Sequence, residues 1–163
     1  VLHGLWPDGA DGKWPQFCQP VSLLSEEVLR ANLCATPSAQ LLQHEYARHG
    51  SCTGLPPADY FRLSTGLYER LRFPDMAALA GRPGLTAGAF VQAMARANPG
   101  LEPQMMRIVR NKRGWLEEVR LCLDRGARRF TRCTGAAGDG LALASARLRI
   151  EPPLSGRRAP ARR

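Results

Sequence analysis

The three histidines of the chain all lie in two short segments that also carry other polar and aromatic residues. The first segment is His3–Pro7 (HGLWP) and the second is His44–Gly50 (HEYARHG). The ordinary pKa of histidine lies close to neutral pH, so one imidazole can accept a proton while a second donates one. Glu45 and Arg48 add a carboxylate and a guanidinium to the second segment. Although a solitary histidine is more often structural, this grouping predicts general acid–base chemistry on an anionic substrate.

The spacing within the second segment bears on whether it binds a metal. Helices that chelate zinc place two histidines four residues apart, so that both rings face the same way. His44 and His49 are five residues apart, which corresponds to about 140° around a helix. By contrast, Glu45 lies four residues before His49, and His44 lies four residues before Arg48. A helix would therefore present a Glu/His face beside a His/Arg face, and we expect neither a metal nor any other cofactor.

The first histidine segment overlaps a predicted strand. Val1–Leu5 is a short apolar run that stops at Pro7, because proline cannot continue a strand ladder. Residues 8–20 contain the glycine, proline and aspartate that are typical of a loop. Because the chain begins inside this strand, we expect that further sequence precedes it, together with any targeting signal.

The second histidine segment lies at the end of a predicted helix. Ser38 can cap a helix that continues to about Arg48 and ends at the next glycine. An amphipathic helix, Ser22–Leu33, precedes it. A third helix begins at Pro57 or Asp59. Its predicted buried side consists of aromatic and leucine side chains: Tyr60, Phe61, Leu63, Leu67 and Leu71.

The second half of the chain predicts short helices followed by strands. Helices are expected over Met76–Leu79 and after the cap Thr86, the latter ending before Pro99. The strand patterns that follow are Met105–Val109, Trp115–Leu123, Phe130–Thr134 and Leu141–Ile150. Because helices precede strands without βαβ alternation, the sequence predicts a single α+β domain, with an antiparallel β-sheet packed with several α-helices. We assign this domain to residues 1–150 and a basic, disordered tail to residues 151–163.

Length and composition narrow the class of protein. A chain of 163 residues suits one domain, and no apolar run approaches the length of a membrane span. The net charge of +9 suits a polyanionic partner such as RNA, although a solvated basic surface would give the same charge. Five cysteines without a CxxC pair indicate disulfides and an oxidising compartment, and the odd number leaves one thiol without a partner.

The two histidine segments, in this order, resemble the active-site segments of the ribonuclease T2 family, the secreted acid and S-like endoribonucleases. The resemblance continues in Asp11–Cys18 (DGKWPQFC), in the Gly-Ser-Cys that follows His49, and in Glu117–Cys122 (EEVRLC). It extends over about residues 1–135. The family has a strand and a loop before the first segment, and we expect that this N-terminal strand is missing here.

The resemblance implies metal-independent cleavage of single-stranded RNA by a monomeric endoribonuclease. His3 and His49 would act as general base and general acid, so that one removes the ribose 2′-OH proton and the other protonates the departing 5′-oxygen. This attack gives a 2′,3′-cyclic phosphate, which water then opens to a 3′-phosphate. His44, Glu45 and Arg48 would hold the phosphate and stabilise the charge of the pentacovalent transition state. DNA lacks the attacking hydroxyl, so it would not be cleaved.

The resemblance also implies a base pocket and two disulfides. Trp6, Asp8 and Trp14 match base-binding positions, where an aromatic face stacks on a base and a carboxylate accepts a hydrogen bond from its amine. Core packing is the alternative for both tryptophans, and a turn is the alternative for Asp8. The implied disulfides are Cys18–Cys52 and Cys122–Cys133. Cys34 would then pair with the missing N-terminal part or stay free.

Some positions depart from the family pattern. The family usually has lysine where Arg48 stands and tryptophan where Tyr46 stands, and arginine keeps the charge and can bind phosphate with two hydrogen bonds. A family cysteine expected near Arg107 is absent. The alternative function is that of a catalytically inactive RNA-binding relative, which would have lost a catalytic histidine, whereas this chain keeps all of them. The implied location is extracellular, vacuolar or lysosomal within the endomembrane system, or periplasmic, with no membrane partner.

Overall fold

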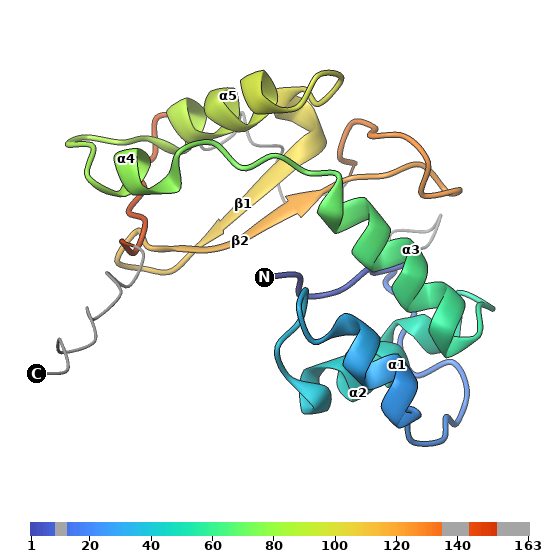
Figure 1. Cartoon of the computed structure of the whole chain (residues 1–163). Helices are drawn as coiled ribbons and strands as arrows, with labels where there is room; N and C mark the ends of the chain where they lie inside the picture. The colour runs from blue at the N-terminus through green and yellow to red at the C-terminus, as the bar shows by residue number, and fades with distance from the viewer. Residues whose placement is uncertain (9–12, 135–143, 153–163) are drawn as a thin grey trace, which may run out of the picture. The chain divides into compact units, whose positions relative to one another are not determined.

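The computed structural model describes residues 1–8, 13–134 and 144–152 (Figure 1). These residues contain five α-helices and one antiparallel pair of strands, so the predicted α+β class is confirmed. The chain divides into two compact units, Val1–Leu71 and Arg72–Arg163. Each unit has its own cluster of buried apolar side chains. The predicted domain limit at residue 150 stays a prediction.

The described residues of the first unit contain three α-helices and one 3-10 turn, which are α1 (Glu26–Asn32), α2 (Ala39–Arg48), η1 (Gly50–Cys52) and α3 (Pro57–Glu69). Ser25 and Ser38 cap α1 and α2, because each hydroxyl accepts a hydrogen bond from the backbone N–H three residues later. Pro57 opens α3, at a position where the missing N–H of proline costs no helical hydrogen bond. The helix predicted from Ser22 begins instead at Glu26, since Ser25 is the residue that caps it.

Aromatic side chains form the centre of the first unit's core. Tyr60 is fully buried and packs edge-on against Phe61, with their ring centroids 5.0 Å apart. Tyr46 of α2 packs on the same pair, and Leu24 and Leu42 complete the cluster. These contacts fix α2 against α3. Three leucines predicted to be buried on α3 and just beyond it are only half buried, namely Leu63, Leu67 and Leu71.

The first residues of the chain are not a strand, so that prediction is wrong. Leu2 donates its N–H to the carbonyl of Ala35 at 2.9 Å, and its own carbonyl accepts a hydrogen bond from the Thr36 hydroxyl at 2.7 Å. The Tyr60 hydroxyl donates to the carbonyl of Leu5 at 2.8 Å and accepts from its N–H at 3.2 Å. The N-terminal segment is therefore held by single hydrogen bonds to the Ala35 backbone and to the side chains of Thr36 and Tyr60. These bonds do not form a continuous strand ladder.

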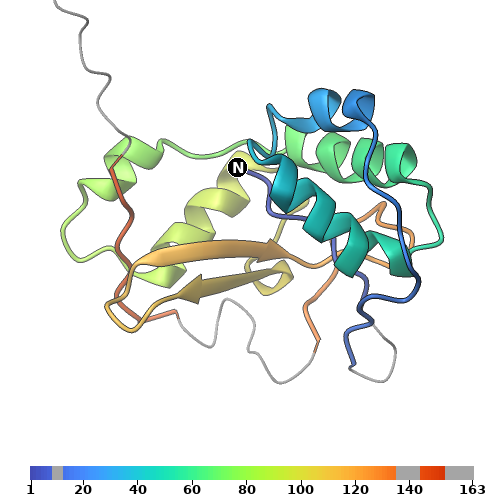
Figure 2. The same ribbon diagram turned by 90° about the horizontal axis from the view of Figure 1, so that it is seen from below.

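The described residues of the second unit contain two α-helices, a 3-10 turn and a β-hairpin, which are α4 (Met76–Ala80), α5 (Ala87–Ala97), η2 (Pro103–Met105), β1 (Met106–Arg110) and β2 (Leu116–Leu121). The two strands pair antiparallel, with Met106 opposite Leu121. In both views α5 lies along this hairpin (Figures 1 and 2). The core of the unit includes side chains from α5 and β1: Phe90, Val91, Met94, Met106 and Ile108.

The hairpin continues beyond β2 into a disulfide-bonded loop. The return strand predicted over Phe130–Thr134 is reduced to a single bridge between Phe130 and Leu123, so its predicted extent is wrong. Cys122 and Cys133 are joined by a disulfide across this loop, which is the pairing that the resemblance implies. The disulfide and the backbone hydrogen bond from the N–H of Thr131 to the carbonyl of Cys122, at 2.9 Å, together link the two ends of the loop.

The segment before residue 150 lies between two other segments of the second unit. Of the strand predicted over Leu141–Ile150, the first three residues lie outside the described part of the chain. In the remainder, the N–H of Arg149 donates to the carbonyl of Gly114 at 2.8 Å, and the N–H of Leu148 donates to that of Leu85 at 2.9 Å. Because the partners alternate between two segments, isolated bridges form where a longer strand was predicted.

Other predicted features fall partly outside the described residues. Of the predicted tail, 151–163, only Glu151 and Pro152 are described, and both are exposed. Residues 9–12 of the predicted loop 8–20 are also outside, and the rest of that loop contains neither helix nor strand. Within the described residues, no helix is both long enough and apolar enough to cross a membrane.

Candidate active site

The C-terminal half of α2 carries four residues that can do chemistry. His44, Glu45 and Arg48 lie on the helix, and His49 is its C-cap, with a backbone N–H that still donates to the carbonyl of Glu45 at 2.9 Å. Glu45 and His49 are buried, Arg48 is half buried and His44 is exposed. The end of the helix therefore turns one carboxylate and one imidazole inward and leaves the other two side chains nearer the surface.

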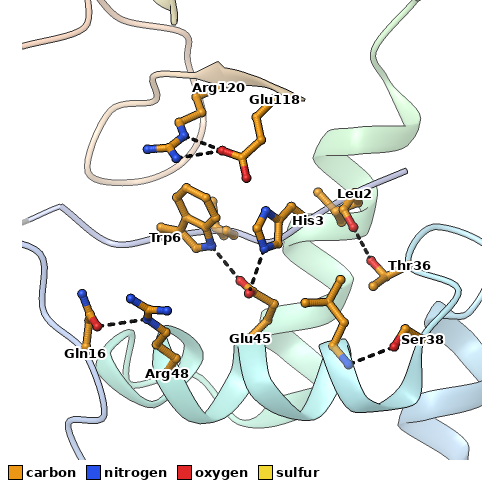
Figure 3. A network of polar contacts seen from close by, with 12 residues as sticks. Leu2, His3, Trp6, Gln16, Thr36, Ser38, Glu45, Arg48, Glu118 and Arg120 are labelled. Atoms are coloured by element: carbon orange, nitrogen blue, oxygen red, sulfur yellow. Dashed lines mark hydrogen bonds and ion pairs between the residues drawn. The ribbon is translucent and has the colours of Figure 1, made fainter. Parts of the chain in front are cut away.

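The carboxylate of Glu45 joins the two histidine segments. Only 2% of Glu45 is exposed, and its Oε2 accepts a hydrogen bond from the indole Nε1 of Trp6 at 2.7 Å. Its Oε1 lies 3.4 Å from the Nε2 of His3 (Figure 3). A buried carboxylate is costly unless donors compensate it, and the two ring N–H groups are placed to do so. One side chain thus sets the positions of both rings of the first segment.

Two glycines permit the close approach that this arrangement needs. A Cβ at Gly4 would overlap the Oε2 of Glu45, so a side chain there would push the first segment away from the carboxylate. A Cβ at Gly50 would overlap the ring of Tyr46, so a side chain there would disturb the turn that follows His49. Glycine is therefore needed at both positions because a Cβ would overlap a neighbouring side chain, and the sequence pattern alone did not reveal this.

His49 lies in a more apolar setting than a typical surface histidine. It is 7% exposed, and its ring lies against the indole of Trp6 with the ring centroids 5.3 Å apart. Its Nδ1 is buried and has no hydrogen-bond partner among the described residues. Burial, followed by the nearby Arg48, His44 and His3, lowers the pKa of His49 to about 4. The ring is therefore neutral at mildly acidic and neutral pH, and can accept a proton.

His3 has the opposite surroundings. Its side chain is 47% exposed and stands beside the Glu45 carboxylate. Its ring meets the indole of Trp6 edge-on, with the centroids 5.0 Å apart. The Nε2 of His3 lies 3.4 Å from the Oε1 of Glu45, so the carboxylate can orient this exposed ring. Trp6 contacts both imidazoles, of which that of His49 is buried and that of His3 is exposed.

Arg48 is positioned by the loop that follows the first segment. Its Nε donates to the Oε1 of Gln16 at 2.9 Å (Figure 3), and its carbonyl accepts from the N–H of Phe17 at 2.8 Å. The Cys18–Cys52 disulfide joins the same loop to η1, which is the pairing that the resemblance implies. The hydrogen bond to Gln16 uses only the Nε of Arg48, so the two terminal nitrogens of the guanidinium can donate to an anion.

Residues 1–133 match the family model described as the ribonuclease T2 family. The chain belongs to this family. The matched range includes both histidine segments, the Gln16 loop and both disulfides. The ribonuclease T2 match therefore covers every residue of the site described above.

Two bacterial relatives illustrate the likeness of this ribonuclease T2 chain. A "Probable ribonuclease" of Haemophilus influenzae is 29% identical over 130 residues, which is 77% of this chain and 43% of that protein. A "Ribonuclease" of Aeromonas hydrophila is 30% identical over 131 residues, which is 77% of this chain and 58% of that protein. The chain therefore spans about half the length of these relatives.

Solved structures show the same fold. RNase NT, solved in complex with 5′-AMP, superposes with a TM-score of 0.63 at 24% identity and covers 92% of this chain and 81% of its own. Ribonuclease MC1 from the seeds of bitter gourd gives a TM-score of 0.59 at 21% identity and covers 81% of this chain and 77% of its own. At these identities the likeness concerns the ribonuclease T2 fold alone.

The three residues predicted to bind a base are placed differently. Trp6 is half buried and contacts the imidazoles of His3 and His49, while its Nε1 donates to Glu45. Asp8 and Trp14 are both exposed, and they border the stretch outside the described residues. The structure thus brings Trp6 into the histidine cluster, and a role in base binding stays a prediction for all three.

The sequence did not predict several residues that position the site. Thr36 and Tyr60 fix the backbone on either side of His3, and Gln16 fixes Arg48. Gln16 lies inside the family-like segment Asp11–Cys18, which is the only signal that marked it. Within the described residues, no three His, Cys, Asp or Glu side chains gather as metal ligands would. The arrangement is suited to proton transfer and to binding an anion.

Proposed function

We propose that this chain is an endoribonuclease that cleaves single-stranded RNA by transesterification to a 2′,3′-cyclic phosphate and then hydrolyses that product to a 3′-phosphate. The observation that carries the proposal is the contrast between the two imidazoles around Trp6. His49 is buried with a pKa lowered to about 4, and His3 is exposed beside the Glu45 carboxylate. A buried, neutral imidazole can act as the base of this reaction, and an exposed imidazole oriented by a carboxylate can act as its acid.

In the first step His49 acts as the base. It takes the proton of the ribose 2′-OH, and the 2′-oxygen attacks the adjacent phosphorus. The bond from phosphorus to the 5′-oxygen breaks, and His3 gives its proton to that oxygen. In the second step water attacks the phosphorus of the cyclic phosphate and His3 accepts the proton of the water. The bond from phosphorus to the 2′-oxygen breaks, and His49 returns its proton to that oxygen. Both rings end in their starting states, so the cycle balances.

The remaining polar residues would serve the phosphate. The guanidinium of Arg48, held at Nε by Gln16, can donate to the non-bridging oxygens as charge accumulates on the pentacovalent transition state. His44 is exposed one helical turn before Arg48 and can add a further donor. Glu45 holds His3 and Trp6 in place. Because the nucleophile belongs to the substrate, no metal-bound water is required, and DNA, which lacks the hydroxyl, is not a substrate.

The wider assignments are part of the same proposal. Trp6, Asp8 and Trp14 would form a base pocket in the RNA-bound protein, and the chain would act as a monomer. Two disulfides fit an oxidising compartment, so we infer an extracellular, vacuolar–lysosomal or periplasmic location. The Haemophilus influenzae and Aeromonas hydrophila relatives carry the name ribonuclease, which supports an activity of this class.

The test is digestion of single-stranded RNA in excess EDTA, with analysis of the product ends. Wild-type protein should release fragments that end first in 2′,3′-cyclic phosphate and later in 3′-phosphate. His49→Ala should slow cleavage by at least about a hundredfold, because a general base is removed, and 2′-deoxy substrate should stay intact. Products ending in 3′-hydroxyl, or cleavage abolished by EDTA, would contradict the mechanism. A folded wild-type chain that binds RNA without cleaving it would favour the inactive RNA-binding relative.

A further inference from the structure

The second unit contains a cavity of about 250 Å³ that the proposed reaction does not use. It lies between the connection from α4 to α5 and the segment that ends at residue 150. Its floor is apolar, because four buried side chains line it: Leu79, Leu85, Leu148 and Ile150. Its rim carries one indole, that of Trp115, and three arginines: Arg82, Arg147 and Arg149.

Backbone hydrogen bonds hold the walls of this cavity together. Arg149 donates its N–H to the carbonyl of Gly114 and accepts at its own carbonyl the N–H of Leu116, both at 2.8 Å. These two bonds bracket Trp115 and fix it beside Arg149. On the other side, the N–H of Leu148 donates to the carbonyl of Leu85 at 2.9 Å. The indole and the arginine backbone therefore have defined places before any ligand arrives.

Among the described residues, no acidic side chain neutralises the charge on the rim. The guanidinium carbon of Arg149 lies 5.8 Å from the centre of the Trp115 ring, and stacking of this kind is compatible with a purely structural role. However, Arg82, Arg147 and Arg149 are all exposed, and none forms an ion pair within the described part of the chain. The described residues that line the cavity include no acid. Three unneutralised guanidinium groups around an aromatic ring favour a ligand that is both anionic and flat.

We propose that this cavity is an accessory subsite that binds one nucleotide of single-stranded RNA. The base would stack against Trp115, as bases do on exposed aromatic rings in single-strand binding proteins. The phosphate would accept hydrogen bonds from Arg147 and Arg149, whose planar groups can bind it with two bonds each. The subsite rests on the proposed function for its choice of ligand, and its residues come from the second unit alone, whereas the histidines come from the first.

Binding is measured in a His49→Ala background with a single-stranded RNA of about ten nucleotides, a length within the range of single-strand sites. The double substitution Arg147→Gln with Arg149→Gln should weaken binding about tenfold at low salt and lower the salt slope by about 1. Trp115→Leu should weaken binding about tenfold, and Trp115→Phe should restore most of it. The control is Arg96→Gln, which removes one positive charge from an exposed position on α5 outside the cavity and should stay within about twofold of the parent.

Cleavage separates this subsite from the proposed activity. With His49 intact, cleavage of a dinucleotide requires only the histidine site, so the cavity variants should cleave it at the wild-type rate while their KM for longer RNA rises about tenfold. The subsite is overturned if the double variant binds RNA as tightly as Arg96→Gln, or if dinucleotide cleavage falls as much as cleavage of long RNA. If wild-type protein cleaves neither substrate, the proposed function fails, and the binding comparison still decides the subsite.

Discussion

At the scale of single residues, the site separates two identical side chains by their surroundings. Burial against Trp6 disfavours the charged form of His49 and lowers its pKa to about 4. His3 is half exposed, and its Nε2 lies 3.4 Å from the Oε1 of Glu45. The proposed assignment of base and acid therefore depends on burial and on one carboxylate, and neither can be read from the identity of the two histidines.

The acidic limb of the pH–rate profile tests this assignment. The pKa of the essential base in the free enzyme sets that limb for kcat/KM, so cleavage of a dinucleotide should fall about tenfold per pH unit below about 4. Because Arg48 contributes to lowering the pKa of His49, Arg48→Gln should move the limb to higher pH. The rate at the plateau should also fall, but the position of the limb is the informative quantity.

Arg48→Lys is the matched control for this experiment, because it keeps the positive charge and changes only the shape of the donor. Its acidic limb should stay where the wild-type limb lies, even though its plateau rate changes. A limb that moves equally in both variants, or in neither, would show that the charge of Arg48 does not act on the catalytic base.

At the scale of elements, the sequence correctly predicted the helices whose start is marked by a capping residue next to the helix itself. The caps Ser38 and Thr86 mark the starts of α2 and α5, because a hydroxyl bonds an N–H three residues away. The N-terminal strand was wrong, because what holds this segment is Thr36 and Tyr60, which lie far along the chain. For the same reason the sequence grouped the histidines but gave no sign that Tyr60 holds the segment that carries His3.

The Tyr60 hydroxyl offers a test of that positioning. Tyr60→Phe removes the two hydrogen bonds to the backbone of Leu5 and should lower the free energy of unfolding by about 1–2 kcal/mol. Because His3 and Trp6 lie on the loosened segment, kcat/KM for a dinucleotide should also fall about tenfold. Urea unfolding and steady-state kinetics at a temperature where the variant is fully folded measure the two effects.

Tyr46→Phe is the control, since Tyr46 is a neighbour in the same core and its hydroxyl donates to the carbonyl of Leu55 at 3.0 Å. It should cost about 1 kcal/mol of stability but leave kcat/KM within about twofold. Equal losses of activity in the two variants would mean that the loss reflects stability alone, and the positioning role of Tyr60 would be rejected.

At the scale of the whole molecule, the proposed chemistry and the proposed subsite belong to different units. Every residue of the candidate active site lies in Val1–Leu71, and the arginine-rimmed cavity lies in Arg72–Arg163. Each unit also contains one disulfide, Cys18–Cys52 or Cys122–Cys133. The net charge of +9 predicted a polyanionic partner without indicating where it binds, because a charge total carries no position. The structure places part of that charge at two sites, namely Arg48 in the candidate active site and the three arginines at the rim of the cavity.

The buried base should also link the stability of the molecule to pH. The pKa of His49 is about 4 in the folded protein and 6.5 in its unfolded reference, so between these values the unfolded chain binds more protons. The free energy of unfolding therefore falls as pH decreases from about 6.5 to about 4. Below about pH 4 the stability that the neutral, buried His49 ring contributes is lost. His49→Gln removes the titrating group, so the decrease in unfolding free energy across the window should shrink by on the order of 2 kcal/mol. Urea unfolding at several pH values measures it, and parallel curves for wild type and variant would show that His49 is not held neutral by burial.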